Sequence, residues 1–304
     1  MHILITGGTG LIGQSLIPVL IKKNYQVVLL TRNKKAAQDI FGKQVSGLDA
    51  IVEDLQQVNF NHLDAVINLA GEPIVNKRWT RKQKQELCES RWQLTQQLVN
   101  MINSSQTPPS VFISGSAIGI YGRQGGKMID ETFEDFYPEF SHTLCHEWEK
   151  IACQAESEKT RVCLSRTGIV LAPDGGALEK MLPAFRFGLG GPIASGAQMM
   201  SWIHIEDMVK MLVFLLENDT LFGPFNATAP NPVSNEEFSK TLAKALNRPC
   251  IFRVPETVMK LAMGEMSDLL VHGQAVVPRK LQEAGFQFRY PELGVALASI
   301  LQDR

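Results

Sequence analysis

The chain has no hydrophobic run long enough to cross a membrane and no excess of charge of either sign. Its longest apolar stretch, Met208–Leu216, is interrupted by Lys210, whereas about 20 apolar residues are needed to span a bilayer. Lysine and arginine number 30 against 31 aspartate and glutamate residues, a net charge of −1 over 304 residues. Such a balance lacks the basic field of proteins that bind nucleic acid or lipid surfaces. We therefore expect neither nucleic acid nor a membrane as partner.

The cysteines are few, odd in number and scattered: Cys88, Cys145, Cys153, Cys163 and Cys250. Their spacing fits neither a disulfide framework nor a metal site and is typical of reduced thiols in the cytoplasm. The first residues predict a strand rather than a signal peptide. We expect a cytoplasmic protein without a bound metal.

A glycine-rich loop follows the first predicted strand. Residues 3–13 read Ile-Leu-Ile-Thr-Gly-Gly-Thr-Gly-Leu-Ile-Gly, and a helical pattern starts directly afterwards. The three spaced glycines have separate roles: one permits a tight turn, one lets a pyrophosphate approach the backbone, and one lets the helix pack closely. Free N–H groups at the start of the helix would meet the phosphates. The residues predicted to hold a dinucleotide are Gly7, Thr9, Gly10, Leu11, Ile12 and Gly13.

The second predicted strand, Gln26–Thr31, is followed by cations rather than an acid. A site for NAD has a carboxylate about 20 residues beyond the glycines, where it accepts the ribose 2′-hydroxyl. Residues 24–38 contain no aspartate or glutamate, but they do contain Arg32 and two lysines. A guanidinium can stack on adenine and hold a 2′-phosphate through paired hydrogen bonds. Thr31 and Arg32 are therefore predicted to select NADP(H), with a solvated basic loop as the alternative.

Strand and helix patterns alternate through the first half of the chain. This alternation predicts an α/β fold, a Rossmann-like doubly wound parallel sheet with helices on both faces. Further strands are predicted at 49–52, 65–69, 111–114 and 161–166, and long helices at 80–103 and 142–158.

The second half has a different character, with a soft boundary near residue 172. We expect residues 1–172 to bind the dinucleotide and residues 173–304 to form a smaller mixed α/β region for the substrate. A helix near 205–217 is expected to pack back on the first domain. The segment 183–201 is rich in glycine and proline and is expected to form a loop or lid.

Small residues end the predicted strand at 65–69. Ligands of doubly wound sheets lie beyond the carboxyl ends of the strands, so Leu69, Ala70 and Gly71 are expected to let the backbone approach the cofactor ribose. A plain glycine-terminated strand is the alternative. Asp54 and Leu55, after the third predicted strand, are weaker candidates for contact with adenine.

The strand at 111–114 continues into Ser114-Gly115-Ser116-Ala117-Ile118-Gly119-Ile120-Tyr121-Gly122. Together with the glycine motif, this segment resembles the extended short-chain dehydrogenase/reductase superfamily, which includes nucleotide-sugar epimerases. The resemblance implies that Ser116 hydrogen-bonds the reacting hydroxyl or carbonyl oxygen. A small residue before a turn is the alternative.

The Tyr-x-x-x-Lys pair of that superfamily is missing. No tyrosine of the chain has a lysine four positions later, and the matching helix has Cys145 and Glu149 in their places. In the usual pair the lysine cation lowers the pKa of the phenol, so that the phenol can move a proton. Tyr121 is the candidate acid in its place. His142 and His146 form an alternative proton-transfer face with Glu149, although a solvated helix face explains them as well.

The run Trp202-Ile203-His204-Ile205-Glu206-Asp207 matches an aromatic–apolar–His–apolar–x–Asp segment of the extended members. The resemblance implies that Asp207 orients the following helix and that Trp202 lines the substrate cleft. His204 is expected to be structural, with a substrate contact as the alternative. Arg186 is a candidate for binding an anionic substrate group, and a surface position explains it equally.

Further matches cover essentially the whole chain, including Arg166-Thr167-Gly168, residues 188–192, Ala284-Gly285-Phe286 and Tyr290-Pro291-Glu292-Leu293. Together they resemble one atypical epimerase family, labelled as nucleoside-diphosphate-sugar epimerases, with a C-terminal domain of its own. The resemblance implies NADP(H) binding, while the label epimerase rests on fold analogy.

Two functions follow from these observations. The first is an NADP(H)-dependent oxidoreductase or epimerase acting on a hydroxyl or carbonyl compound, with Ser116 and Tyr121 in the reaction. The second is a non-catalytic NADPH-binding or redox-sensing protein, which the missing Tyr–Lys pair favours. The identity of the small-molecule substrate does not follow from the sequence. The sequence is compatible with a homodimer that forms through the helix at 80–103.

Overall fold

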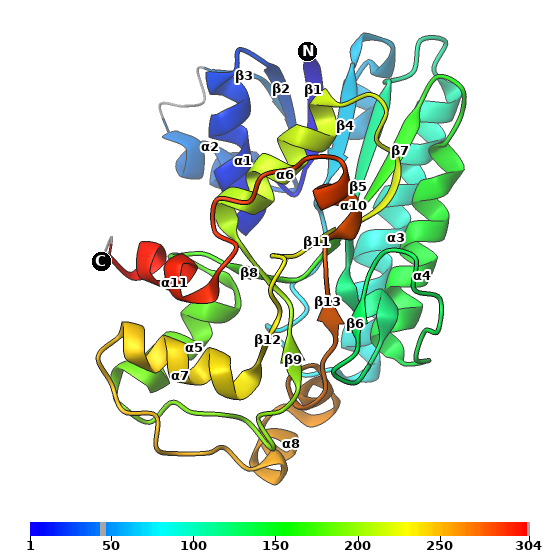
Figure 1. Ribbon diagram of the computed structural model, residues 1–304. Coiled ribbons are helices and arrows are strands. Elements are labelled where there is room, and N and C mark those ends of the chain that lie inside the picture. The colour runs from blue at the N-terminus through cyan, green and yellow to red at the C-terminus, as the bar shows by residue number, and fades with distance from the viewer. Residues whose placement is uncertain (43–46, 303–304) are drawn as a thin grey trace.

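The computed structural model describes residues 1–42 and 47–302. Its centre is a seven-stranded parallel sheet in the order β11-β7-β5-β4-β1-β2-β3 (Figure 1). The strands are β1 His2–Thr6, β2 Gln26–Leu30, β3 Leu48–Val52, β4 Ala65–Asn68, β5 Val111–Ala117, β7 Arg161–Thr167 and β11 Gly223–Ala227. The strand order reverses between β1 and β4, which confirms the predicted doubly wound sheet.

The seventh strand, β11, was not predicted from the sequence. It lies at the edge of the sheet and pairs with β7. Its sequence, Gly-Pro-Phe-Asn-Ala, contains the two residues most depleted in strands, and proline is tolerated at an edge because one side of the strand needs no donor. The sheet therefore takes a strand from well beyond residue 172.

Helices cover both faces of the sheet. On one face lie α1 (Leu11–Lys22), α2 (Lys34–Phe41) and α6 (Ile205–Glu217), and on the other lie α3 (Arg81–Ser104) and α4 (Phe140–Ala152). Ile3 and Ile5 of β1 point into the first layer and Leu4 into the second, as the two-residue repeat of a strand requires. The Tyr25 hydroxyl also donates to Glu217 at 2.6 Å, which ties α6 to the first half of the chain.

The rest of the chain packs below the carboxyl end of the sheet in Figure 1. Helices α5 (Gly176–Arg186), α7 (Asn235–Ala245) and α11 (Leu293–Gln302) surround an apolar cluster that includes Leu178, Phe238 and Leu297. The smaller elements are β6 Met128–Ile129, β8 Ile169–Leu171, β9 Met199–Met200, β10 Trp202–His204, β12 Val233–Ser234, β13 Ala275–Val276, α8 Glu256–Met263, α9 Asp268–Val271 and α10 Arg279–Glu283. The segment expected to be a lid begins within the last turn of α5 and is otherwise loop until β9.

A buried carboxylate joins this region to the sheet. Asp207, in the first turn of α6, accepts the N–H groups of Arg289 and Tyr290 at 2.8 Å each. The two oxygens of Asp207 thus hold the chain just before α11, whereas the side chain that caps α6 is His204. None of the described helices is both long and apolar enough to cross a membrane.

Candidate functional site

The three glycines of the loop between β1 and α1 lie in different surroundings, as their spacing predicts. Gly7 has a φ of 68°, and a Cβ there would lie 2.5 Å from the carbonyl carbon of Leu69, so the turn against the end of β4 requires glycine. A Cβ on Gly13 would lie 2.4 Å from the Cα of Gly8, which explains the close start of α1. A Cβ on Gly10 would approach only the Gly7 carbonyl oxygen, at 3.2 Å. The outer side of Gly10 is therefore open to a ligand.

The first turn of α1 carries amide donors without protein acceptors. Gly10 is the N-cap and has no side chain to cap with, and within residues 1–42 and 47–302 the N–H groups of Leu11, Ile12 and Gly13 make no hydrogen bond. The Thr9 carbonyl accepts from Gln14 at 2.7 Å, which keeps the loop in shape. Unpaired amides at the positive end of a helix dipole suit a pyrophosphate.

Arg32 lies exposed at the carboxyl end of β2, and in the described part of the chain it forms no ion pair. Its neighbours have fixed partners, since Thr31 Oγ1 accepts the Asn33 N–H at 3.2 Å and Asn33 Oδ1 accepts the Ala36 N–H at 2.9 Å. The pKa of Glu72, on the loop after β4, is lowered mainly by the hydrogen bond from Lys77 and to a smaller degree by Arg32. The guanidinium thus lies near the ends of both β2 and β4, free to bind an anion.

The residues after β3 differ from the expectation of an adenine contact. Asp54 caps a short 3-10 turn by accepting the Gln56 N–H at 2.9 Å, and Leu55 is buried in the core against α3. The Leu55 side chain therefore cannot meet a ligand, because it fills the core. Asp54 remains exposed, with one carboxylate oxygen already used as a cap.

A buried chain of hydrogen bonds supports the end of β4. Thr6 Oγ1 donates to Asn68 at 2.6 Å, Asn68 Nδ2 donates to Thr95 at 2.9 Å, and Trp148 Nε1 donates to Thr95 at 2.9 Å. The chain connects β1, β4, α3 and α4 below Leu69 and Ala70, whose backbone touches Gly7. Thr95 could not be predicted from the sequence, because nothing in the pattern of a single helix marks its partners.

Ser116 belongs to a buried charged network. Its hydroxyl donates to Glu149 Oε1 at 2.6 Å, and Glu149 in turn accepts two bonds from Arg166, to Oε1 at 2.9 Å and to Oε2 at 2.8 Å. All three side chains are less than a tenth exposed. Because its hydrogen goes to the carboxylate, Ser116 Oγ can only accept a further hydrogen bond. Glu149, the acid in the place of the usual lysine, is therefore neutralised by Arg166 of β7.

Tyr121 lies in the same network, and its surroundings argue against the expected role as a proton donor. The side chain is fully buried; Arg166 Nη1 donates to its oxygen at 3.0 Å, and its hydroxyl donates to Asn226 Oδ1 at 2.7 Å. Burial raises the pKa of Tyr121 to about 12. The phenol is thus a structural link between β7 and β11 rather than a group that faces substrate.

Cys145 and the two histidines of α4 have structural surroundings as well. Burial, and then the Glu149 carboxylate, raise the pKa of Cys145 to about 12, so the thiol stays protonated. His142 bonds the Ile120 carbonyl at 2.6 Å and stacks on His146, whereas Glu149 faces the interior. No group of three or more His, Cys, Asp or Glu side chains in residues 1–42 and 47–302 is arranged to hold a metal.

Trp202 and His204 have core positions in place of the substrate contacts considered from the sequence. Trp202 is fully buried, and its indole N–H donates to the Asn231 carbonyl at 3.2 Å. His204 Nδ1 accepts the Glu206 N–H at 3.1 Å as the N-cap of α6, and its Nε2 faces Ser299 at 3.2 Å. Arg186 is exposed at the end of α5.

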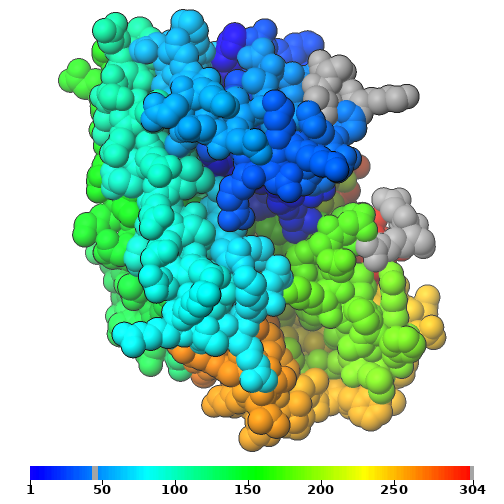
Figure 2. Space-filling view, turned by 180° about the vertical axis from the view of Figure 1, so that it is seen from behind, coloured from blue at the N-terminus to red at the C-terminus, as the bar shows by residue number. Residues whose placement is uncertain are grey.

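The segment 72–80 connects the end of β4 to the lower region. Lys180 of α5 donates to the Val75 carbonyl at 2.9 Å, and Arg78 donates to the carbonyls of Leu261 and Ala262 at 2.8 Å each. Seen from behind, the cyan part of the chain lies against the green and orange parts (Figure 2). These hydrogen bonds join the segment after β4 to α5 and α8.

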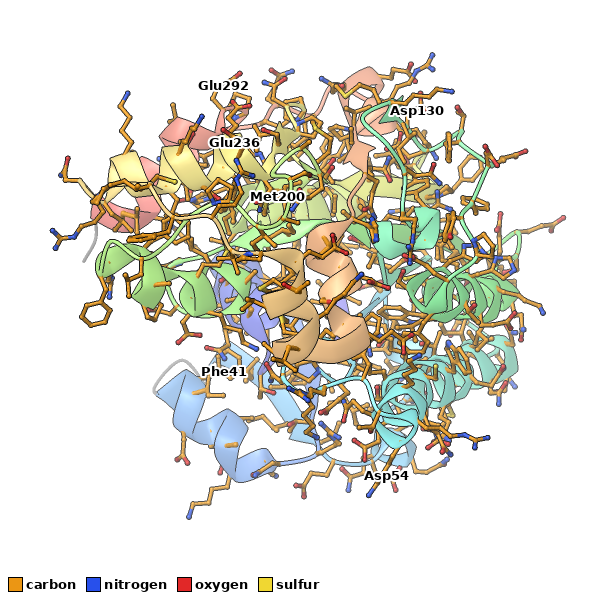
Figure 3. The ribbon with its side chains drawn as sticks, turned by 90° about the horizontal axis from the view of Figure 1, so that it is seen from below. Phe41, Asp54, Asp130, Met200, Glu236 and Glu292 are labelled. Carbon is orange, nitrogen blue, oxygen red and sulfur yellow. The ribbon has the colours of Figure 1, made fainter. Side chains whose placement is uncertain are left out.

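A separate hollow of about 620 Å³ lies at the start of α7, lined by Ser195, Gly196, Ala197, Ser234, Glu236, Glu237, Lys240 and Thr241. Figure 3 shows Glu236 and Asp54 at opposite sides of the molecule. Glu236 is paired with Lys240 and Arg253. This hollow is therefore not part of the site at the ends of the strands.

Comparison with known proteins gives matches along the whole chain. The model of the NAD dependent epimerase/dehydratase family matches residues 3–227, and a domain of unknown function, DUF1731, matches residues 254–300. An epimerase family protein of Staphylococcus aureus is 37% identical over 98% of this chain and 98% of its own length. The epimerase family protein YfhF of Bacillus subtilis is 39% identical over 100% of this chain and 99% of its own.

Solved structures of epimerases are similar to this chain as well. The human epimerase family protein SDR39U1, crystallised with NADPH, superimposes with a TM-score of 0.91 at 34% identity, over 100% of both chains. The UDP-glucuronic acid 4-epimerase of Bacillus cereus, solved with UDP-glucuronic acid and NAD, has a TM-score of 0.75 at 18% identity over 100% of both chains. At that identity it shares the fold alone.

Replacing Glu149 with alanine is expected to lower the free energy of unfolding by about 3–5 kcal/mol, because Arg166 is left buried without its counter-ion. Urea denaturation measures the change. The control is Glu147→Ala, which removes an exposed pair with Lys150 at 3.6 Å and should cost about 1 kcal/mol or less. Equal losses for the two variants would contradict the buried network.

The buried His204 is expected to make the free energy of unfolding depend on pH. Burial lowers its pKa, so folding favours the neutral ring; its contribution is present above the unfolded pKa of about 6.5 and is lost as pH falls further. The free energy of unfolding should fall by up to about 1.4 kcal/mol per pH unit from this one proton. His204→Asn keeps a capping oxygen but does not titrate, so its curve should be flatter below pH 7. Parallel curves for both proteins would contradict the assignment.

Proposed function

Because the chain belongs to the NAD-dependent epimerase/dehydratase family, we propose that it is an NADP(H)-dependent epimerase-like oxidoreductase. Its substrate is a small molecule with a hydroxyl or carbonyl group, and a nucleotide sugar is one such compound. The observation that carries the proposal is the first turn of α1, with open space at Gly10 and three amide donors without acceptors. The NADPH in the human relative's structure supports the choice of cofactor.

The residues present fit a phosphorylated dinucleotide. The amides of Leu11, Ile12 and Gly13 would hold the pyrophosphate, and Arg32 would hold the 2′-phosphate. No acid lies on β2 to accept a free 2′-hydroxyl, and Glu53, after β3, accepts the Lys34 N–H at 3.1 Å. Ala70 and Gly71 would let the ribose approach the backbone.

Ser116 would bind the reacting oxygen at the end of β5. Its hydroxyl hydrogen is held by Glu149, so it offers a lone pair to the hydroxyl of an alcohol substrate and orients that group. NADP(H), when bound, supplies or takes up the hydride. Arg166 holds both carboxylate oxygens of Glu149 and thereby fixes the group toward which the Ser116 hydroxyl is turned.

A second candidate is a non-catalytic NADPH-binding or redox-sensing protein. The observation in its favour is that Cys145 and Glu149 stand where the superfamily has tyrosine and lysine, and that Tyr121 is fully buried. The Tyr121 phenol is then not exposed to a substrate at Ser116 and cannot move its proton.

Arg32→Ala is expected to raise the Kd for NADPH by about 10-fold to 100-fold, since charge-assisted hydrogen bonds contribute about 1.5–3 kcal/mol. The Kd for NADH, which lacks the 2′-phosphate, should change little. Fluorescence titration of the reduced nicotinamide gives both values. Lys22→Ala, which removes an equal charge from the far end of α1, is the control, and an unchanged NADPH affinity in Arg32→Ala would refute the assignment.

Ser116→Ala separates the two functions. For an enzyme, it should abolish NADP⁺ reduction in a screen of alcohols while the Kd for NADPH stays within about twofold, because the serine binds the substrate hydroxyl rather than the cofactor. Wild-type protein that binds NADPH but turns over no compound, and that captures a partner in an NADPH-dependent manner, would favour the sensor.

A further inference from the structure

Within residues 1–42 and 47–302, Arg91 of α3 forms no ion pair with a carboxylate. Its Nη1 donates to the Leu87 carbonyl and its Nη2 to the Glu72 carbonyl, each at 3.0 Å. The guanidinium lies over the ring of Trp148, with Cζ 5.3 Å from the ring centre. Burial lowers its pKa, although an arginine stays charged in proteins. The bonds described leave several of its five N–H donors unused.

The groups around Arg91 do not cancel this charge. Burial raises the pKa of both Cys88 and Cys145, so both thiols are neutral near pH 7. The Glu149 carboxylate is held by Arg166, and the Glu72 carboxylate lies 3.0 Å from Lys77. Both acids are thus paired with other cations. Glu72 still acts to raise the pKa of Arg91, but burial, which lowers that pKa, is the larger effect, so the charge of Arg91 is only partly offset.

The position of Arg91 is set by two glycines. A Cβ on the exposed Gly71, just past β4, would lie 2.8 Å from Arg91 Cζ, and a Cβ on Gly115 of β5 would lie 2.9 Å from the Trp148 ring. Glycine at both places lets Arg91 and its supporting ring approach the ends of β4 and β5. Gly115 directly precedes Ser116, so the charge of Arg91 and the proposed reaction centre lie at the ends of the neighbouring strands β4 and β5.

The two halves of a doubly wound sheet hold different halves of a dinucleotide. The glycine loop and Arg32 lie on the β1–β3 half, which therefore takes the adenosine part. The β4–β5 half, where Arg91 lies, is left for the nicotinamide part. The oxidised nicotinamide ring has a formal positive charge and the reduced ring has none, so a nearby cation in a medium of low dielectric constant disfavours the oxidised form.

We propose that Arg91 makes this site select the reduced cofactor, so that NADPH binds more tightly than NADP⁺. The inference rests on the proposed dinucleotide site and adds the residue that sets its preference between oxidation states. A site of this kind retains NADPH, as a reductase or a sensor of reduced cofactor requires.

The test uses the full-length protein and three probes: NADPH, NADP⁺ and adenosine 2′,5′-bisphosphate, which lacks the nicotinamide half. Wild-type protein should bind NADPH more tightly than NADP⁺, and Arg91→Gln should reduce the ratio of their Kd values by about tenfold. Arg91→Lys, which keeps the charge, should keep most of the ratio. The Kd for adenosine 2′,5′-bisphosphate should not change in either variant.

Arg81→Gln is the matched control, since it removes an exposed arginine from the start of the same helix. An unchanged ratio in Arg91→Gln, or a loss equal to that of Arg81→Gln, overturns the inference. If Arg91→Gln does not fold, the wild-type protein still tests the inference. Equal Kd values of the wild-type protein for NADPH and NADP⁺ are sufficient to overturn it. Wild-type protein that binds none of the three probes overturns the proposed function itself.

Discussion

The ion pair between Glu149 and Arg166 is the interaction on which the site depends. Each of these charges would cost several kcal/mol to bury alone, so α4 and β7 must bring them together for the fold to form. The pair then fixes two further groups, because Glu149 takes the hydrogen of Ser116 and Arg166 donates to Tyr121. A catalytic tyrosine and lysine are thus replaced by a buried, fully bonded network. In the proposed function, this network would contact the substrate through Ser116.

The charges at the edge of the sheet follow a simple arrangement. Arg32 lies on the half proposed to take the adenosine part, Arg91 lies on the other half, and the pair formed by Glu149 of α4 and Arg166 of β7 is neutral. A phosphorylated, reduced dinucleotide has negative charge at its adenosine end and a neutral ring at the other, and so matches this arrangement. The segment 72–80 joins the same edge to α5 and α8, which places the C-terminal region directly over the proposed site.

The sequence was sufficient for features that depend on local patterns. Parallel strands buried on both faces read as continuous apolar runs, which is why β1, β2, β4, β5 and β7 could be predicted, and the glycine loop has roles that follow from its spacing. The edge strand β11 could not be predicted, since glycine and proline conceal its pattern. Glu149 and Arg166 lie on different elements, so the partner of the acid in the lysine position could not be predicted. Trp202 and Leu55 looked like ligand contacts because a pattern does not tell which side of an element faces the core.

The central claim, that the ends of these strands form an NADP(H) site, is tested most directly by thermal denaturation of the wild-type protein with each of four nucleotides: NADPH, NADP⁺, NADH and NAD⁺. A ligand at about a hundred times its Kd should add about 2.7 kcal/mol of stability. The two phosphorylated nucleotides are expected to stabilise the protein, NADPH most, and NADH and NAD⁺ are expected to do so weakly. Protein verified free of cofactor by its absorbance near 340 nm and stabilised by none of the four, or equally by NADH and NADPH, would contradict it.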